Sequence, residues 1–178
     1  MFSSLFGVGY VIVRYRKNGV LKRLKATPLM PFEFLAAQVI SRLWLIIMVT
    51  GLVYTGTDIF VGFRMNGSYL TLLLVLALGA LSMISLGLIV AARMANEEAA
   101  NGLLNMLSWP MMLLSGVWFS LEGSPQIVQQ LALLLPLTHF TQAAREVMID
   151  GAGLREIRWH LAVLSAMTGI FLTIGEIG

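Results

Sequence analysis

Residues 69–92 read YLTLLLVLALGALSMISLGLIVAA and carry no charged side chain. A transmembrane helix needs roughly 20 apolar residues, because the hydrocarbon core of a bilayer is about 30 Å thick. The composition agrees, since 58% of the 178 residues are hydrophobic and only 12% are charged, whereas a soluble domain carries about 25% charged residues. The chain is therefore predicted to be an integral membrane protein.

Three further windows are apolar enough to predict spans. Residues 34–56 are interrupted only by Arg42, residues 102–119 are short but uncharged, and residues 159–177 are apolar almost to their end. Residues 1–13 are apolar but too few to cross a bilayer, so they are predicted to form a partial span. The expected fold class is all-α, a polytopic membrane helix bundle of four full spans plus an N-terminal partial span.

The basic residues predict the orientation of the bundle. Residues 14–31, RYRKNGVLKRLKATPLMP, hold six of the twelve basic side chains and no acidic one. Because basic residues gather in cytoplasmic loops, this segment, residues 93–102 and the C-terminus are expected to be cytoplasmic. Residues 58–68 and 120–158 are then outside, and the chain is expected to be a multi-pass protein of the inner membrane.

The long outer segment is too polar to span a bilayer and too apolar for a solvated loop. It predicts two short helices that form an outer hairpin over residues 124–150. Each helix has an apolar face, so we expect the pair to be re-entrant and to dip into the outer leaflet. Irregular backbone at that depth is tolerated only where it packs against protein.

The ends of the two hairpin helices are predicted from capping residues. Ser124 is expected to cap the first helix, with Pro125 in its first turn. Pro136 is expected to end that helix by removing a backbone donor. Thr138 is expected to cap the second helix, and Gly151 to follow its last turn.

The order of these features resembles a known family. The most specific pieces are LKRLKATPL at residues 21–29 and the block from LSGVWF to LPLTHF at residues 114–140. They are similar to the type-2 permease subunit of ATP-binding-cassette (ABC) exporters, and the resemblance covers nearly the whole chain. Members of that family usually have six spans, of which the first and most of the second are not present here. The chain is therefore expected to be an N-terminally shortened member or a fragment that cannot export on its own.

The resemblance implies a function. A permease of this family would move an apolar or amphipathic compound, such as a drug, an antibiotic, or a lipid-linked or polysaccharide cargo, out of the cell. It would lie in the lipid bilayer, pair with a second copy or a related permease, and be driven by a separate ATPase subunit. The chain contains no phosphate-binding loop of the G-x-x-x-x-G-K type. No cofactor, metal, catalytic residue or nucleic-acid partner is expected of it.

The basic segment has two interpretations. Asn18 can cap a short helix with apolar residues on one face and basic residues on the other. The resemblance implies that this is the coupling helix that docks on the ATPase subunit, through Asn18, Gly19, Leu21, Lys22, Arg23, Leu24 and Lys25. The alternative is a cytoplasmic loop held by anionic lipid, at about 1 kcal/mol per basic residue. Both can hold at once.

Arg42 is the charge inside a predicted span. It costs a few kcal/mol if it faces lipid, so it should reach the cytoplasmic surface, pair, or face a wet cavity. Gln38 lies one turn earlier and can share a hydrogen bond with it. Two roles stay open, a structural arginine that reaches the surface and a residue at a cavity or dimer interface.

The remaining chemical signals are weak. His139 and His160 lie on separate outer elements with no third ligand in reach by spacing, so two interfacial histidines are favoured over a metal site. Ser115 and Gly116 favour small-residue packing over a serine site, because no base lies in the spans to activate the hydroxyl. The alternative function is a non-transporting membrane protein, either an accessory packing subunit or a membrane-embedded enzyme.

Overall fold

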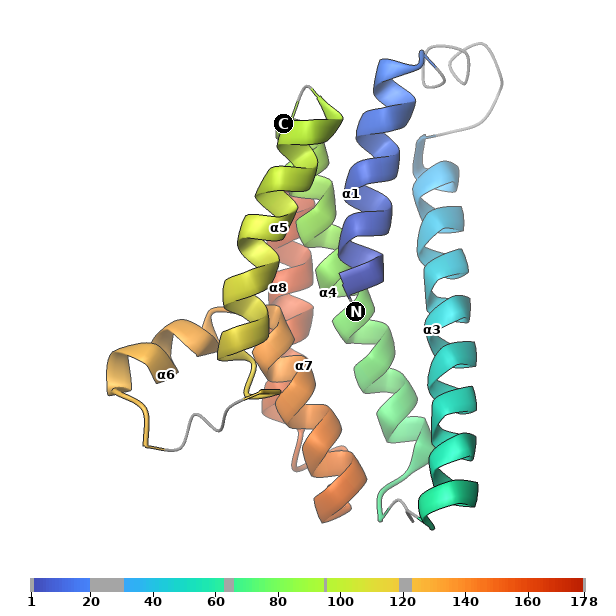
Figure 1. Cartoon of the computed structure of the whole chain (residues 1–178), viewed down its shortest axis with the longest axis vertical. Helices are drawn as coiled ribbons and strands as arrows, with labels where there is room; N and C mark the ends of the chain where they lie inside the picture. The colour runs from blue at the N-terminus through green and yellow to red at the C-terminus, as the bar shows by residue number, and fades with distance from the viewer. Residues whose placement is uncertain (1, 20–30, 63–65, 95, 119–122, 178) are drawn as a thin grey trace.

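A computed structural model describes residues 2–19, 31–62, 66–94, 96–118 and 123–177. Within these ranges the chain is all-α, as predicted, and no strand occurs. The helices are α1 (Phe2–Lys17), α3 (Pro31–Val61), α4 (Tyr69–Arg93), α5 (Glu97–Leu114), α6 (Gln126–Leu133), α7 (Pro136–Arg145), the π-helix η1 (Glu146–Asp150) and α8 (Arg158–Ile177) (Figure 1).

The connections between helices gather at two opposite ends of the bundle. The end of α1, the start of α3, the turn from α4 to α5 and the C-terminus lie at one end in Figure 1. The turn from α3 to α4 and the end of α7 lie at the other end, and α6 projects sideways from the same half of the bundle. These are the two groups that the charge bias assigns to opposite membrane sides. Which end faces the cytoplasm stays a prediction.

Within the described ranges, two helices are long and apolar enough to cross a membrane. They are the stretch Ala36–Thr57 of α3 and the whole of α4. The apolar part of α8, Arg158–Ile174, falls below that length. Two of the four expected spans thus have the length and composition of membrane helices, and the other two stay predictions.

Helix α5 begins and ends earlier than the expected window of residues 102–119. Asn96 caps α5, because its Oδ1 accepts a hydrogen bond of 2.7 Å from the backbone N–H of Ala99. Glu97 and Glu98 then occupy the first turn, where the helix dipole favours acidic side chains. The helix ends at Leu114 because Gly116 takes a left-handed conformation with φ 75°.

The first helix is longer than the expected partial span of residues 1–13. It continues through the basic residue Arg14 to Lys17, because nothing in this stretch breaks a helix. The N–H of Asn18 donates to the carbonyl of Arg14 at 3.0 Å, and Gly19 follows with φ 68°. The segment assigned to residues 14–31 therefore begins inside a helix.

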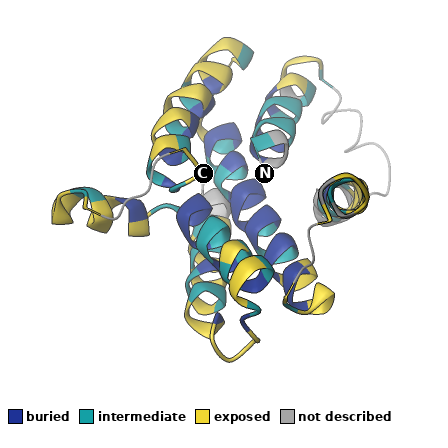
Figure 2. Cartoon of the chain, turned by 60° about the horizontal axis from the view of Figure 1, so that its bottom comes forward, coloured by how far each residue is buried: buried dark blue, intermediate teal, exposed yellow. Residues whose placement is uncertain are grey.

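The core of the bundle is built around α4, which lies at the centre in Figure 2. Half of its span window is buried, against 6% of the window in α3. One apolar cluster joins α4 to α1 and α5 through Met83, Leu5 and Leu104. The other joins the N-terminal half of α4 to the hairpin and to α3. Most side chains described on α3 face away from this core.

Glycines bring α1 and α4 close together. A Cβ atom at Gly87 of α4 would lie 2.7 Å from the carbonyl oxygen of Leu5. A Cβ atom at Gly9 of α1 would lie 3.2 Å from the carbonyl oxygen of Gly87. Small residues at such crossings let two membrane helices approach backbone to backbone, which gives the pair its packing energy.

The hairpin forms two helices as predicted, but three of the predicted helix ends are wrong. Pro125, not Ser124, precedes α6 as its N-cap, and no side chain caps the helix. Pro136 begins α7 rather than ending α6. Proline fits the first helical turn, because the N–H groups of that turn make no hydrogen bond within the helix and the missing one costs nothing. Thr138 consequently lies inside α7, where its hydroxyl donates to the carbonyl of Leu114 at 3.3 Å.

The prediction that Gly151 follows the last turn of the hairpin is confirmed. A five-residue π-helix, η1, continues α7 and ends at Gly151, which has φ 70°. The N–H of Ala152 then donates to the carbonyl of Glu146 at 3.0 Å. Glycine adopts this left-handed conformation without the steric cost that a side chain brings.

Candidate functional site

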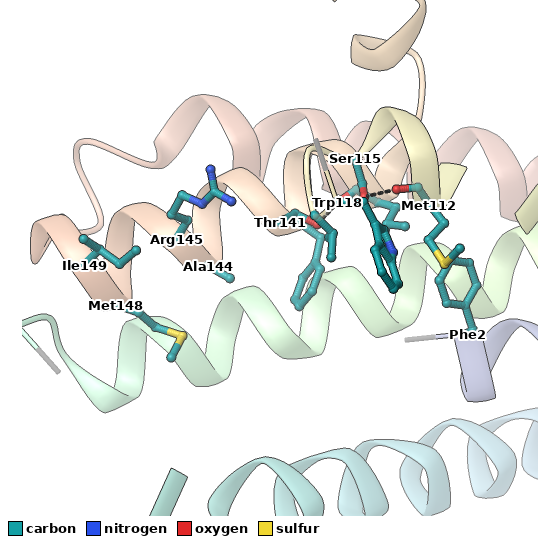
Figure 3. Close-up of a pocket in the computed structure, with 12 residues that line it drawn as sticks. Phe2, Met112, Ser115, Trp118, Thr141, Ala144, Arg145, Met148 and Ile149 are labelled. Atoms are coloured by element: carbon teal, nitrogen blue, oxygen red, sulfur yellow. Dashed lines mark hydrogen bonds between the residues drawn. The ribbon is translucent and has the colours of Figure 1, made fainter. Parts of the chain in front are cut away.

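An apolar pocket of about 470 Å³ lies beside the hairpin. The start of α1, the end of α5 and one face of α7 and η1 line it (Figure 3). Figure 3 shows Phe2, Met112 and Trp118 at one end of the pocket and Met148 and Ile149 at the other. Its lining residues are Phe2, Met112, Ser115, Val117, Trp118, Leu137, Phe140, Thr141, Ala144, Arg145, Met148 and Ile149.

The end of α5 forms one wall of the pocket. The hydroxyl of Ser115 donates to the carbonyl of Met112 at 2.9 Å, which satisfies an acceptor in the last turn. The left-handed Gly116 then turns the chain so that Trp118 lines the pocket. Ser115 is buried, in keeping with the small-residue packing expected for this pair.

Phe140 holds α7 against the central helix. A Cβ atom at Gly79 of α4 would lie 2.5 Å from Cδ2 of the Phe140 ring, so the ring rests directly on the glycine. Phe140 also lines the pocket. The depth of the pocket at this point is therefore set by the absence of a side chain on α4.

The turn between α3 and α4 supports the far wall. The Nδ2 group of Asn66 donates to the carbonyl of Ile149 at 2.7 Å, and its backbone N–H donates to the carbonyl of Met148 at 3.3 Å. Gly67 packs so closely that a Cβ atom there would overlap the carbonyl oxygen of Val147. The turn thus provides donors to carbonyls near the end of η1.

Arg145 is the charged residue among the described residues that line the pocket. It ends α7, and its Nη2 donates to the carbonyl of Gly116 at 3.3 Å. This bond joins α7 to the turn that follows α5. The side chain is exposed to the surroundings while it borders the pocket.

His139 and His160 are far apart in the sequence, but the structure places them in contact. The Nδ1 atoms of His139 and His160 lie 3.0 Å from each other. Nε2 of His139 lies 2.8 Å from the carbonyl of Leu133, and Nε2 of His160 lies 3.5 Å from Oε1 of Glu146. Among the residues that the structure describes, no group of three or more histidine, aspartate or glutamate side chains is placed to hold a metal ion.

The environment of His139 changes its pKa. This residue lies in the hairpin, outside the predicted spans, and is 2% exposed. Burial lowers its pKa below 6.5, the carbonyl of Leu133 raises it in part, and the charge of His160 lowers it further. His139 therefore favours its neutral form.

Arg42 of α3 faces the first helix. Its guanidinium lies against Gly7 of α1, where a Cβ atom would overlap it. Gly7 precedes the last residue of α1, Lys17, by ten positions, which is about 15 Å along a helix. Gln38 lies one turn earlier and is half-buried. The roles of Gln38 and Arg42 at a cavity or dimer interface stay predictions.

The predicted coupling residues fall mostly outside the described ranges. Leu21, Lys22, Arg23, Leu24 and Lys25 lie within residues 20–30, which the structure does not describe. Asn18 and Gly19 are described, and they end α1. The coupling role of the whole segment stays a prediction.

Comparison with known proteins gives related permeases. The inner membrane transport permease YhhJ of Escherichia coli (strain K12) is 30% identical over 176 residues, which cover 93% of this chain and 45% of that protein. The linearmycin resistance permease protein LnrN of Bacillus subtilis (strain 168) is 24% identical over 172 residues, covering 97% and 44%. The probable multidrug ABC transporter permease YbhS of E. coli (strain K12) is 24% identical over 142 residues, covering 79% and 38%.

The chain thus spans less than half the length of these relatives. No solved structure matches it. A family model described as ABC-2 type transporter matches residues 1–149, which include α1 to α7. The chain belongs to the ABC-2 type transporter family of membrane permeases.

Proposed function

We propose that the chain is the membrane-spanning part of an ABC exporter that moves an apolar or amphipathic compound out of the cell. A separate ATPase subunit drives the movement, and a second copy or a related permease completes the path. The chain itself uses no ATP and catalyses no reaction. Relatives named for linearmycin resistance and multidrug transport support a cargo of this class.

The pocket is the observation that carries this proposal. Pockets for small molecules commonly measure about 300 to 1,000 Å³ and are lined mainly by apolar and aromatic side chains. The pocket beside the hairpin has a volume of about 470 Å³ and such a lining. It lies in the half of the bundle that the charge bias places toward the outside, on the side where an exported compound would leave.

The other predicted residues take roles that fit the same function. Residues 18–25 dock on the ATPase subunit, and the helix that precedes them, α1, borders the pocket at its other end through Phe2. Movement of the ATPase subunit would therefore be passed along one helix. Gln38 and Arg42 lie at a cavity or at a dimer interface.

The function is tested by filling the pocket. Ala144 lines it and is half-buried, so Ala144→Trp places an indole in the pocket. Ala162 of α8 is exposed and does not line it, so Ala162→Trp is a control of equal bulk. The measurement is efflux of a fluorescent apolar dye from cells that express the permease with its ATPase subunit.

We expect Ala144→Trp to lower efflux to the level of a complex with an inactive ATPase, while Ala162→Trp exports normally. Unchanged efflux in both variants would remove the pocket from the path. Absence of any ATP-dependent efflux with any dye would favour the non-transporting alternative, an accessory packing subunit.

A further inference from the structure

The polar groups of the pocket lining are not equivalent. Among the lining residues that the structure describes, Ser115 and Thr141 carry hydroxyl groups, and each hydroxyl has a single hydrogen to donate. The hydroxyl of Ser115 donates to the carbonyl of Met112 at 2.9 Å, and that of Thr141 to the carbonyl of Leu137 at 2.8 Å. Both donors are therefore used within the protein, and neither is available to a ligand.

Arg145 differs from these residues. A guanidinium has five N–H groups, and its Nη2 donates to the carbonyl of Gly116 at 3.3 Å. A neutral carbonyl orients the side chain but does not cancel its charge. Among the lining residues that the structure describes, there is no aspartate or glutamate.

The acidic residue next in the chain is directed elsewhere. Oε1 of Glu146 lies 3.5 Å from Nε2 of His160 on α8. His160 is not among the residues that line the pocket. An apolar pocket with one positive charge at its edge matches a ligand with an apolar body and one negative charge. Guanidinium groups bind carboxylate, sulfate and phosphate oxygens through paired hydrogen bonds.

We propose that the pocket binds anionic amphiphiles, with the apolar body in the pocket and the anionic group on Arg145. This inference rests on the proposed function, because it names the class of cargo for the same pocket. A membrane phospholipid and a free anionic compound share this chemistry, so the test uses a soluble amphiphile in micelles that contain no phospholipid.

Trp118 supplies the readout, because it lines the pocket and bromine quenches indole fluorescence on contact. The chain has four tryptophans. Replacing Trp44, Trp109 and Trp159 by phenylalanine leaves Trp118 as the reporter. A second variant that keeps only Trp159 is the matched control, since Trp118 is 65% exposed, Trp159 is 67% exposed, and Trp159 does not line the pocket.

The probes are a terminally brominated undecyl sulfate and the matching brominated undecanol, which differ in charge. Quenching of the Trp159 variant measures partition into the micelle and is subtracted. We expect the sulfate to quench Trp118 at a concentration about tenfold lower than the alcohol, because charge-assisted hydrogen bonds are stronger than neutral ones. Arg145→Gln should remove this difference and leave quenching by the alcohol unchanged, whereas Arg145→Lys should keep most of it.

Each result decides one point. Equal quenching by the sulfate and the alcohol in the protein that keeps Arg145 would overturn the proposed preference for anions. The pocket would then remain an apolar binding site. Quenching of Trp118 no stronger than that of Trp159 would overturn binding in the pocket altogether. Unchanged quenching by the alcohol in Arg145→Gln shows that the variant is folded, and a persistent preference for the sulfate in that variant would assign the anion to another residue. Loss of export in Ala144→Trp is a separate result, so the proposed function and the cargo class can fail independently.

Discussion

His160 donates a hydrogen bond to His139 across 3.0 Å, from Nδ1 to Nδ1. The direction follows from the other partners. Nε2 of His139 lies 2.8 Å from the carbonyl of Leu133, which can only accept, so this nitrogen carries the hydrogen and Nδ1 of His139 is the acceptor. The pair connects the end of α6, through α7, to α8 and to Glu146 of η1. A second proton on His139 would place two N–H groups against each other.

The first prediction concerns the pH dependence of stability. Burial lowers the pKa of His139, so the unfolded chain binds the proton more tightly than the folded one. Stability is therefore complete above the unfolded value of about 6.5 and falls as the pH drops through the lowered folded value. Thermal unfolding of the protein in detergent should occur at lower temperature under mildly acidic conditions. Substitution His139→Gln keeps a donor for the carbonyl of Leu133, and it should reduce this pH dependence; an unchanged dependence would contradict the assignment.

The second prediction concerns the contact of Phe140 with Gly79. Substitution Gly79→Ala places a methyl group 2.5 Å from the ring, and overpacking of this kind costs about 1 to 3 kcal/mol. The variant should unfold at lower temperature than the parent protein. Combining it with Phe140→Ala should remove most of the added cost, because the two residues interact directly. Gly51→Ala is the control, since a Cβ atom there meets nothing within 4 Å, and it should be neutral or stabilising by up to about 1 kcal/mol.

The third prediction is that Gly87→Ala destabilises the protein more than Gly79→Ala. A Cβ atom at Gly87 would meet the backbone oxygen of Leu5 at 2.7 Å, and a backbone atom cannot rotate away as a side chain can. Gly87→Ala should therefore lower the unfolding temperature more than Gly79→Ala does, because α1 and α4 must separate. The measurement is thermal unfolding of both variants in one detergent. The reverse order would show that the two helices pack less rigidly than this crossing indicates.

These contacts also separate what the sequence can predict from what it cannot. The charge-free run at residues 69–92 predicts α4 almost to the residue, because lipid requires every backbone group to be paired within the helix. Helix ends were less predictable, since a proline such as Pro136 can end one helix or begin the next. The pocket and the histidine pair depend on how the chain turns at Gly116 and on the π-helix, and neither leaves a periodic pattern in the sequence.

The last prediction concerns coupling to the ATPase subunit. The helix α1 runs without a break to Lys17 and packs on α4 and α5, so it can pass force from the basic segment to the core. Substituting Leu21→Glu with Arg23→Glu removes an apolar docking residue and reverses one charge. The ATPase subunit should then no longer co-purify with the permease, while membrane insertion is retained.

A matched pair at the opposite end of the bundle controls for general damage. Leu154 and Arg155 are both exposed there, so Leu154→Glu with Arg155→Glu makes the same chemical change far from the basic segment. This control should keep the ATPase subunit bound, because a single ATPase-facing end is expected. Loss of the subunit in both double variants would indicate a folding defect rather than docking. Retention in both would show that residues 18–25 form a loop held by anionic lipid, and that the permease contacts its ATPase subunit elsewhere.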